Sequence, residues 1–147
     1  MRKITNISND WLFTLDGEAQ TVNLPHTWNA FDGQDGTNGY LRTKGSYVKE
    51  LEPSDKITFL ECEGVNSKAE IYINGELVAT HEGGYSTFRT DITKYIRNGC
   101  RVEIIADNTP DETVYPTAAD FTFYGGVYRD VNLIEVEDCR FSMLDHG

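Results

Sequence analysis

The stretch Lys68-Ala69-Glu70-Ile71-Tyr72-Ile73-Asn74-Gly75-Glu76 alternates polar and apolar side chains up to an Asn-Gly pair. A period of two is typical of a strand with one buried face and one wet face. Asn74 and Gly75 suit a two-residue type I′ turn, because both central residues of that turn have positive φ. The segment 76–81 is therefore predicted to return as the antiparallel partner of 68–73.

The rest of the chain carries the same short-strand pattern, with turn residues at frequent intervals. Only 90–99 is typical of a helix, of one or two turns, in which Asp91 can cap the start and Gly99 can close the end. Two long segments, 26–42 and 108–119, lack periodicity and are predicted loops. The predicted strands outside the hairpin are 11–15, 21–24, 46–51, 56–62, 100–107 and 127–136. This pattern predicts an all-β fold, an antiparallel β-sandwich, in a single domain.

The charge of the chain argues against several classes of partner. Its 24 acidic and 13 basic residues give a net charge of -11. Nucleic-acid affinity depends on clustered Lys and Arg, so no nucleic-acid partner is expected. The start Met1-Arg2-Lys3 is followed at once by polar residues, unlike a signal peptide, and no apolar run is long enough to span a bilayer. With Met1 as the native start, we expect a cytoplasmic protein with no membrane partner.

Cysteines and acidic turns give no sign of a disulfide or metal site. Cys62, Cys100 and Cys139 are odd in number and widely spaced, which fits neither a disulfide framework nor a metal knuckle. Cys62 and Cys100 are predicted core or strand residues. The segment 32–36 offers oxygen ligands but lacks the spacing and the closing Glu of a calcium loop, so it is predicted to be a turn. No metal and no cofactor are expected.

The segment 120–131, Asp-Phe-Thr-Phe-Tyr-Gly-Gly-Val-Tyr-Arg-Asp-Val, combines a carboxylate, aromatic rings and a Gly-Gly turn at the start of a strand. Aromatic rings can stack on the C–H face of a pyranose, and a carboxylate can accept hydrogen bonds from its hydroxyls. Asp120 is therefore a candidate substrate-binding residue, and Phe121 and Tyr124 are candidate aromatic sugar contacts. The alternative is a structural loop in which Asp120 caps a turn.

Five short motifs occur in one order along the chain. They are Leu24-Pro25-His26-Thr27-Trp28-Asn29, Gly45-Ser46-Tyr47, Ile71-Tyr72-Ile73-Asn74-Gly75-Glu76, Gly83-Gly84-Tyr85-Ser86-Thr87-Phe88 and Gly125-Gly126-Val127-Tyr128-Arg129. In this order the chain resembles the N-terminal sugar-binding domain of glycoside hydrolase family 2, which includes β-galactosidases, β-glucuronidases and β-mannosidases. The resemblance implies a jelly roll of the galactose-binding-domain type over 1–138. It also implies that 139–147 is a linker and the truncated start of an immunoglobulin-like domain.

The resemblance also implies where the chemistry lies. Retaining glycoside hydrolysis needs two carboxylates, and in the resembled family these are glutamates on a downstream (β/α)8 barrel, the acid/base following an Asn. This chain has no Asn-Glu dipeptide and no βα repeat, so it is expected to hold no catalytic residue and to be inactive alone. The resemblance assigns Asp120 to hydroxyls of the terminal sugar. An alkali cation near Asp120 is expected only in the complete enzyme.

Arg42 departs from the family pattern. Counting back three residues from Gly45 reaches Arg42, where some galactosidases have a sugar-binding Asn. An Arg suits a carboxylate or a ring oxygen, so strict galactoside specificity is not implied. Arg42 therefore either binds the substrate or forms a surface or interdomain ion pair.

Five further residues are given framework roles. His26 is predicted to be a hydrogen-bonded turn residue and Trp28 to pack. Alternation predicts core positions for Phe123 and Tyr128. Arg129 is predicted to pair with a carboxylate or to dock the domain on its neighbour.

The first functional hypothesis is a non-catalytic sugar-binding domain of a β-galactosidase-like exo-glycosidase, whose carbohydrate substrate is a β-galactoside or β-glucuronide. Its partners are the downstream domains of the same chain, and the full-length enzyme is expected to be a homo-oligomer. The alternatives are a stand-alone carbohydrate-binding module and a structural sandwich for interdomain or subunit packing, with 26–42 as its arm. Tight sugar binding by the isolated domain would favour the carbohydrate-binding module, and no detectable binding would favour the first hypothesis.

Overall fold

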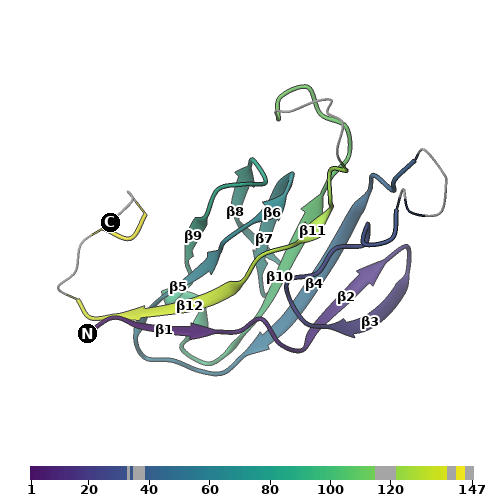
Figure 1. Cartoon of the computed structure of the whole chain (residues 1–147). Helices are drawn as coiled ribbons and strands as arrows, with labels where there is room; N and C mark the ends of the chain where they lie inside the picture. The colour runs from purple at the N-terminus through teal and green to yellow at the C-terminus, as the bar shows by residue number, and fades with distance from the viewer. Residues whose placement is uncertain (33, 35–38, 115–121, 139–141, 145–147) are drawn as a thin grey trace.

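The computed structural model describes residues 1–32, 34, 39–114, 122–138 and 142–144. These residues form a six-stranded sheet, a four-stranded sheet and a two-stranded ladder, and every pairing is antiparallel (Figure 1). The predicted antiparallel β-sandwich is confirmed. No helix in the described part of the chain is long and apolar enough to cross a membrane.

The six-stranded sheet is built around a central strand that is paired along both edges. In spatial order its strands are β3 (Glu18–Val22), β2 (Trp11–Leu15), β4 (Lys44–Leu51), β10 (Cys100–Asp107), β7 (Lys68–Ile73) and β8 (Glu76–Glu82). In the middle of β10, Ile104 lies in register between Tyr47 and Ile71. The alternating apolar residues of three neighbouring strands therefore reach the same face of the sheet.

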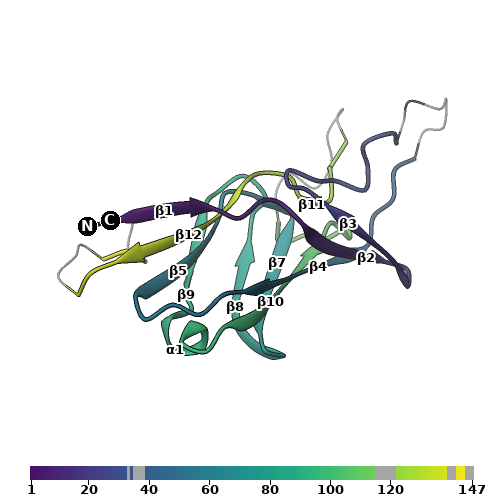
Figure 2. The ribbon, with the colours of Figure 1, turned by 90° about the horizontal axis from the view of Figure 1, so that it is seen from below.

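The opposing sheet is smaller. Its strands, in spatial order, are β1 (Lys3–Asn6), β12 (Val131–Val136), β5 (Ile57–Cys62) and β9 (Phe88–Asp91). The ladder of β11 (Gly126–Val127) with β6 (Val65–Asn66) is hydrogen-bonded to neither sheet but packs beside β10, and α1 (Thr93–Ile96) follows β9. Figure 2 shows β1 and β12 in one layer and β2 and β4 in the other.

The main hydrophobic core fills the space between the two sheets. Trp11, Tyr47 and Ile104 enter it from the six-stranded sheet, and Leu60 and Val131 enter it from the four-stranded sheet. Each of these side chains is at most 1% exposed. Burying an aliphatic or aromatic side chain of this size contributes about 1.5–3 kcal/mol, so this core stabilises the sandwich.

A second apolar cluster covers the other face of the four-stranded sheet. Phe59, Ile134 and Val136 gather there, and Met143 packs on them from beyond the last strand. The Arg89 guanidinium donates a hydrogen bond to the Met143 carbonyl (3.2 Å), which holds the tail residues 142–144 to the sheet.

The predicted hairpin and two whole strands are confirmed. Asn74 and Gly75 have φ of 51° and 84°, and Ile73 pairs with Glu76, as a type I′ turn requires. The strands predicted at 11–15 and 100–107 are found with those bounds. Cys62 and Cys100 are buried strand residues, as predicted, whereas Cys139 lies outside the described residues.

Three predictions of element bounds were wrong. The strand placed at 21–24 is β3, which begins directly after the tight Asp16-Gly17 turn because Leu15 pairs with Glu18. The strand placed at 127–136 is two strands, since the chain leaves its partner β6 after Val127 and joins β5 at Val131. Asp91 ends β9 and does not cap the helix, whose N-cap is Ile92. The Asp91 carboxylate still accepts a hydrogen bond from the Thr93 amide (2.9 Å).

Three strands were not predicted, namely β1, β6 and β9. All four residues of β1 are exposed, so the strand shows no buried face from which alternation could be read. The other two have two and four residues, too few to establish a period.

Candidate functional site

Three connecting segments meet at one end of the six-stranded sheet. They are 26–32 and 39–42, which flank a part of the same connection before β4, 108–114 after β10 and 122–125 before β11. Because β4 and β10 are antiparallel neighbours, the start of one lies beside the end of the other, and Lys44 pairs with Asp107. In Figure 1 the first two segments leave the sheet on the same side.

Two buried amides hold the three segments together. Asn29 and Asn108 are both 0% exposed, and the Asn108 Nδ2 group donates to Asn29 Oδ1 (3.2 Å). The same Nδ2 donates to the Phe123 carbonyl (3.0 Å), while Asn29 Oδ1 accepts the Gly125 amide (2.7 Å). Since each buried polar atom that loses its partner costs about 1–3 kcal/mol, these bonds fix the segments relative to one another.

The carbonyl of Leu41 is the most heavily used acceptor of the site. It lies 2.8 Å from Asn29 Nδ2, 3.1 Å from Asn108 Nδ2 and 3.3 Å from Trp28 Nε1, and the two hydrogens of Asn108 Nδ2 are shared among three acceptors. The Leu41 amide in turn donates to Asp32 Oδ2 (2.8 Å). Asp32 is thus engaged in bracing its own loop, and the backbone directly before residue 42 is held in place. Most of the turn predicted at 32–36 lies outside the described residues.

An aromatic cluster lies beneath this network. Trp28 is half-buried and stacks on Phe13, with ring centroids 6.1 Å apart and planes 10° apart. His26 Nδ1 lies 2.8 Å from the Tyr47 hydroxyl. Burial lowers the pKa of His26 and raises the pKa of Tyr47, so both groups are neutral at pH 7. The predicted framework roles of His26 and Trp28 are confirmed.

Gly125 provides the closest approach in this part of the fold. A Cβ placed on Gly125 would overlap the indole ring of Trp28 and lie 2.7 Å from Asn108 Nδ2. Only a residue without a side chain lets the backbone come this near to both groups.

Arg42 lies on top of the braced segments. Its side chain is half-buried, and its Nε–H donates to the Asn108 carbonyl (2.8 Å). The guanidinium carbon lies 5.3 Å from the ring centroid of Phe123 and 5.7 Å from that of Tyr40, within range of cation–π attraction. The carbonyl therefore holds the Nε edge of the guanidinium, and the two rings, whose centroids lie 6.2 Å apart, approach it from one side.

A narrow cleft begins beside Arg42, with Asn66, Tyr85, Asp111 and Phe123 among its lining residues. Asp111 pairs with Lys68 and accepts hydrogen bonds from Thr113. The hydrogen bond from the Lys68 ammonium has the largest effect on the pKa of Asp111, and the bonds from Thr113 add to it. Together they hold this pKa well below its usual range. This carboxylate is therefore ionised and already engaged.

Residues 35–137 match the family of glycosyl hydrolases family 2, sugar binding domain. The chain belongs to this family.

The relatives of this sugar-binding domain are much longer proteins. A β-glucuronidase of Bacteroides fragilis is 37% identical over 96% of this chain and 22% of its own length. A β-galactosidase of Thermoanaerobacterium thermosulfurigenes is 31% identical over 90% of this chain and 21% of its own length. The crystal structure of Bacteroides uniformis β-glucuronidase matches 100% of this chain and 19% of that chain, at 32% identity and a TM-score of 0.87. The chain spans about a fifth of the length of these relatives.

The structure places some of the predicted site residues of this family 2 domain in one region. Arg42 lies against Phe123. The next residue, Tyr124, is 44% exposed, and its carbonyl accepts a hydrogen bond from Asn66 Nδ2 (2.8 Å). Asp120 and Phe121 lie outside the described residues, so their roles stay predictions.

The framework roles predicted for the aromatic residues and the arginine of the segment 120–131 were confirmed only in part. Phe123 is buried, as predicted, whereas Tyr128 is half-buried and donates its hydroxyl hydrogen to the Gly84 carbonyl. Arg129 was predicted to pair with a carboxylate or to dock the domain on its neighbour. Within the described residues it hydrogen-bonds the carbonyls of Tyr85 (3.2 Å) and Glu63 (3.5 Å) and no carboxylate, and the docking role stays a prediction. Arg129 lies in the connection between β11 and β12, beside the loops that contain these two carbonyls. Its guanidinium therefore donates to backbone oxygens.

Sequence reasoning missed Asn29, Asn66 and Asn108. Asn29 closes the Pro-His-Thr-Trp motif and Asn108 directly follows β10, so both stand at strand or loop junctions. Asparagine is common at such junctions for turn formation alone, and nothing in the sequence shows that two of them meet.

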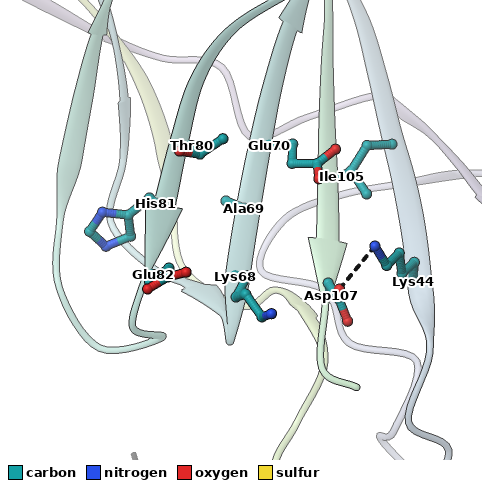
Figure 3. A pocket seen from close by; sticks show the side chains of 9 residues that line it. All are labelled: Lys44, Lys68, Ala69, Glu70, Thr80, His81, Glu82, Ile105 and Asp107. Atoms are coloured by element: carbon teal, nitrogen blue, oxygen red, sulfur yellow. Dashed lines mark ion pairs between the residues drawn. The ribbon is translucent and has the colours of Figure 1, made fainter. Parts of the chain in front are cut away.

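A second hollow, of about 270 Å³, lies on the six-stranded sheet across β4, β10, β7 and β8 (Figure 3). Two of its charges pair with each other, since Lys44 Nζ lies 3.2 Å from Asp107 Oδ2. Burial opposes ionisation of Asp107, but hydrogen bonds from Thr109 and the Lys44 pair outweigh it and lower its pKa. The nine lining residues in Figure 3 include no Tyr, Phe or Trp for a sugar to stack on, so the hollow is a weaker sugar site than the Arg42 region.

Proposed function

We propose that this chain is the sugar-contacting domain of a family 2 exo-glycosidase and forms one wall of an active site whose catalytic glutamates lie elsewhere in the full-length protein. One observation carries the proposal: the buried amides of Asn29 and Asn108 tie three loops at one sheet end and present Arg42 and Tyr124 there. A rigid cluster of loop side chains on a sandwich is suited to hold a ligand and offers no chemistry of its own.

The acids around this end support a non-catalytic role. Retaining hydrolysis needs two carboxyl groups about 5 Å apart and free to act on the substrate. Asp32 accepts two hydrogen bonds from its own loop, and Asp111 is paired with Lys68. Each is engaged in holding the fold.

The substrate is a β-glucuronide or a β-galactoside in this proposal. Both activities appear among the names of relatives that cover nearly all of this chain. The sequence alone favoured a β-galactosidase-like parent, whereas the β-glucuronidase of Bacteroides fragilis is the more similar of the two relatives described, at 37% against 31% identity.

The test is the variant Asp120→Ala in the full-length protein encoded by the gene that contains this chain. We expect kcat/KM on 4-nitrophenyl β-D-glycosides to fall about 100-fold, because a carboxylate that accepts sugar hydroxyls gains strength as charge develops on the ring. The thermal unfolding midpoint should not change.

Asp55→Ala, at an exposed turn position, is the matched control and should keep wild-type kinetics. A full-length protein that hydrolyses no glycoside, or an Asp120→Ala variant with wild-type kcat/KM, would contradict the proposal.

A further inference from the structure

Arg42 differs from the other half-buried arginine of the described chain. Arg89 meets a carboxylate, since its Nε lies 2.7 Å from Glu61 Oε2. Arg42 uses its Nε on a backbone carbonyl, and within the described residues no carboxylate pairs with its guanidinium. This is notable in a chain with a net charge of -11, where acidic partners outnumber basic ones.

The geometry leaves the outer edge of the Arg42 guanidinium free for a ligand. Its Nε–H is held by the Asn108 carbonyl and its central carbon lies within cation–π range of the Tyr40 and Phe123 rings, while the described residues accept no hydrogen bond from its two terminal nitrogens. The Leu41 carbonyl, with three donors on it, keeps the preceding backbone from moving. A guanidinium held in this way presents parallel N–H groups with little entropy left to lose on binding.

A planar pair of N–H donors matches one ligand chemistry best. A carboxylate accepts both N–H groups of an arginine in a bidentate contact, and such charge-assisted bonds are about twice as strong as neutral ones. A hydroxymethyl group offers one oxygen and no charge. A half-buried guanidinium with no internal carboxylate is therefore suited to distinguish a sugar acid from the corresponding neutral sugar.

We propose that Arg42 binds the carboxylate of a uronic acid and makes this domain selective for uronides. The inference rests on the proposed function, because it requires that this end of the sheet form part of a sugar pocket. It goes beyond that function by naming the residue that recognises the substituent at C6 of the sugar. It also separates the two substrate classes, since a β-galactoside has no carboxylate.

The test uses the full-length enzyme and two substrate pairs, each of which differs only at C6. The pairs are the 4-nitrophenyl β-D-glucuronide with the β-D-glucoside, and the 4-nitrophenyl β-D-galacturonide with the β-D-galactoside. For Arg42→Gln we expect kcat/KM on the preferred uronide to fall about 10- to 100-fold, the range of a lost hydrogen bond to a charged group, and kcat/KM on its neutral partner to change less than about threefold. Because both values come from one preparation, any unfolded fraction cancels in their ratio.

Two further variants complete the experiment. Arg42→Lys keeps the charge but not the planar pair of donors, and should lie between wild type and Arg42→Gln. Arg101→Gln is the matched control: Arg101 lies on β10 at the far end from Asp107, and the ratio should not change.

Each outcome has a distinct meaning. Equal losses on uronide and neutral sugar after Arg42→Gln would overturn the role of Arg42 in selectivity. A wild-type enzyme that hydrolyses galactosides but no uronide would overturn the inference while the proposed function stands. A full-length protein with no glycosidase activity would overturn both.

Discussion

Gly125→Val is expected to lower the free energy of unfolding by about 3 kcal/mol, because the new side chain has no space. Its Cβ would overlap the Trp28 ring and lie 2.7 Å from Asn108 Nδ2. The backbone cannot retreat, since the Gly125 amide is bonded to the buried Asn29 Oδ1 (2.7 Å). Urea denaturation of the 147-residue chain measures the loss. In the full-length enzyme we expect most of the activity to disappear, because all three loop segments shift together.

Gly39→Val is the matched control for this effect. Gly39 lies in the same loop region, and a Cβ placed there has no heavy atom within 4 Å. Its unfolding free energy should stay within about 0.5 kcal/mol of wild type. If the two valine variants were equally stable, the close approach of Gly125 to Trp28 would not be a constraint on the fold.

Asn108→Leu is expected to cost a similar amount, about 3 kcal/mol, through lost hydrogen bonds and not through volume. Leucine has nearly the shape of asparagine but leaves the Thr43 amide without Oδ1, its acceptor at 2.7 Å. The carbonyls of Leu41 and Phe123 lose a donor. Denaturation of the chain gives the energy, and kcat/KM of the full-length variant reports whether Arg42 has moved.

Asn98→Leu provides the comparison, because Asn98 is exposed at the end of the α1 turn. It should unfold at the wild-type denaturant concentration. A stable Asn108→Leu variant with intact activity would show that the buried amides do not position the site.

The sequence predicted best those elements whose partners are close along the chain or whose burial alternates. The 68–82 hairpin needs only its own pattern and its Asn-Gly turn, and its register follows from both. β10 shows its buried face at every second residue, so its bounds could also be read. β1 and the split of the last strand were missed because both depend on a partner far away in sequence, β12 for the first and β6 for the second.

The candidate site was predicted only in part, because some of its residues also depend on partners that are far away in sequence. Arg42 was singled out by its distance from Gly45 and by a family resemblance, and the structure places it against Phe123. No local pattern distinguishes Asn29 and Asn108 from ordinary turn residues. Their importance depends on a contact between residues 79 positions apart.

By itself, the sequence determined the all-β class, the 68–82 hairpin and the family, because alternation, turn chemistry and motif order are properties of neighbouring residues. Only the tertiary structure decided which loops share one end of the sandwich and which amides join them. It also showed that Arg42 has no carboxylate partner among the described residues. The physical reason is that burial and hydrogen-bond satisfaction are set by groups brought together by strand pairing, and that pairing joins segments that are distant in the chain.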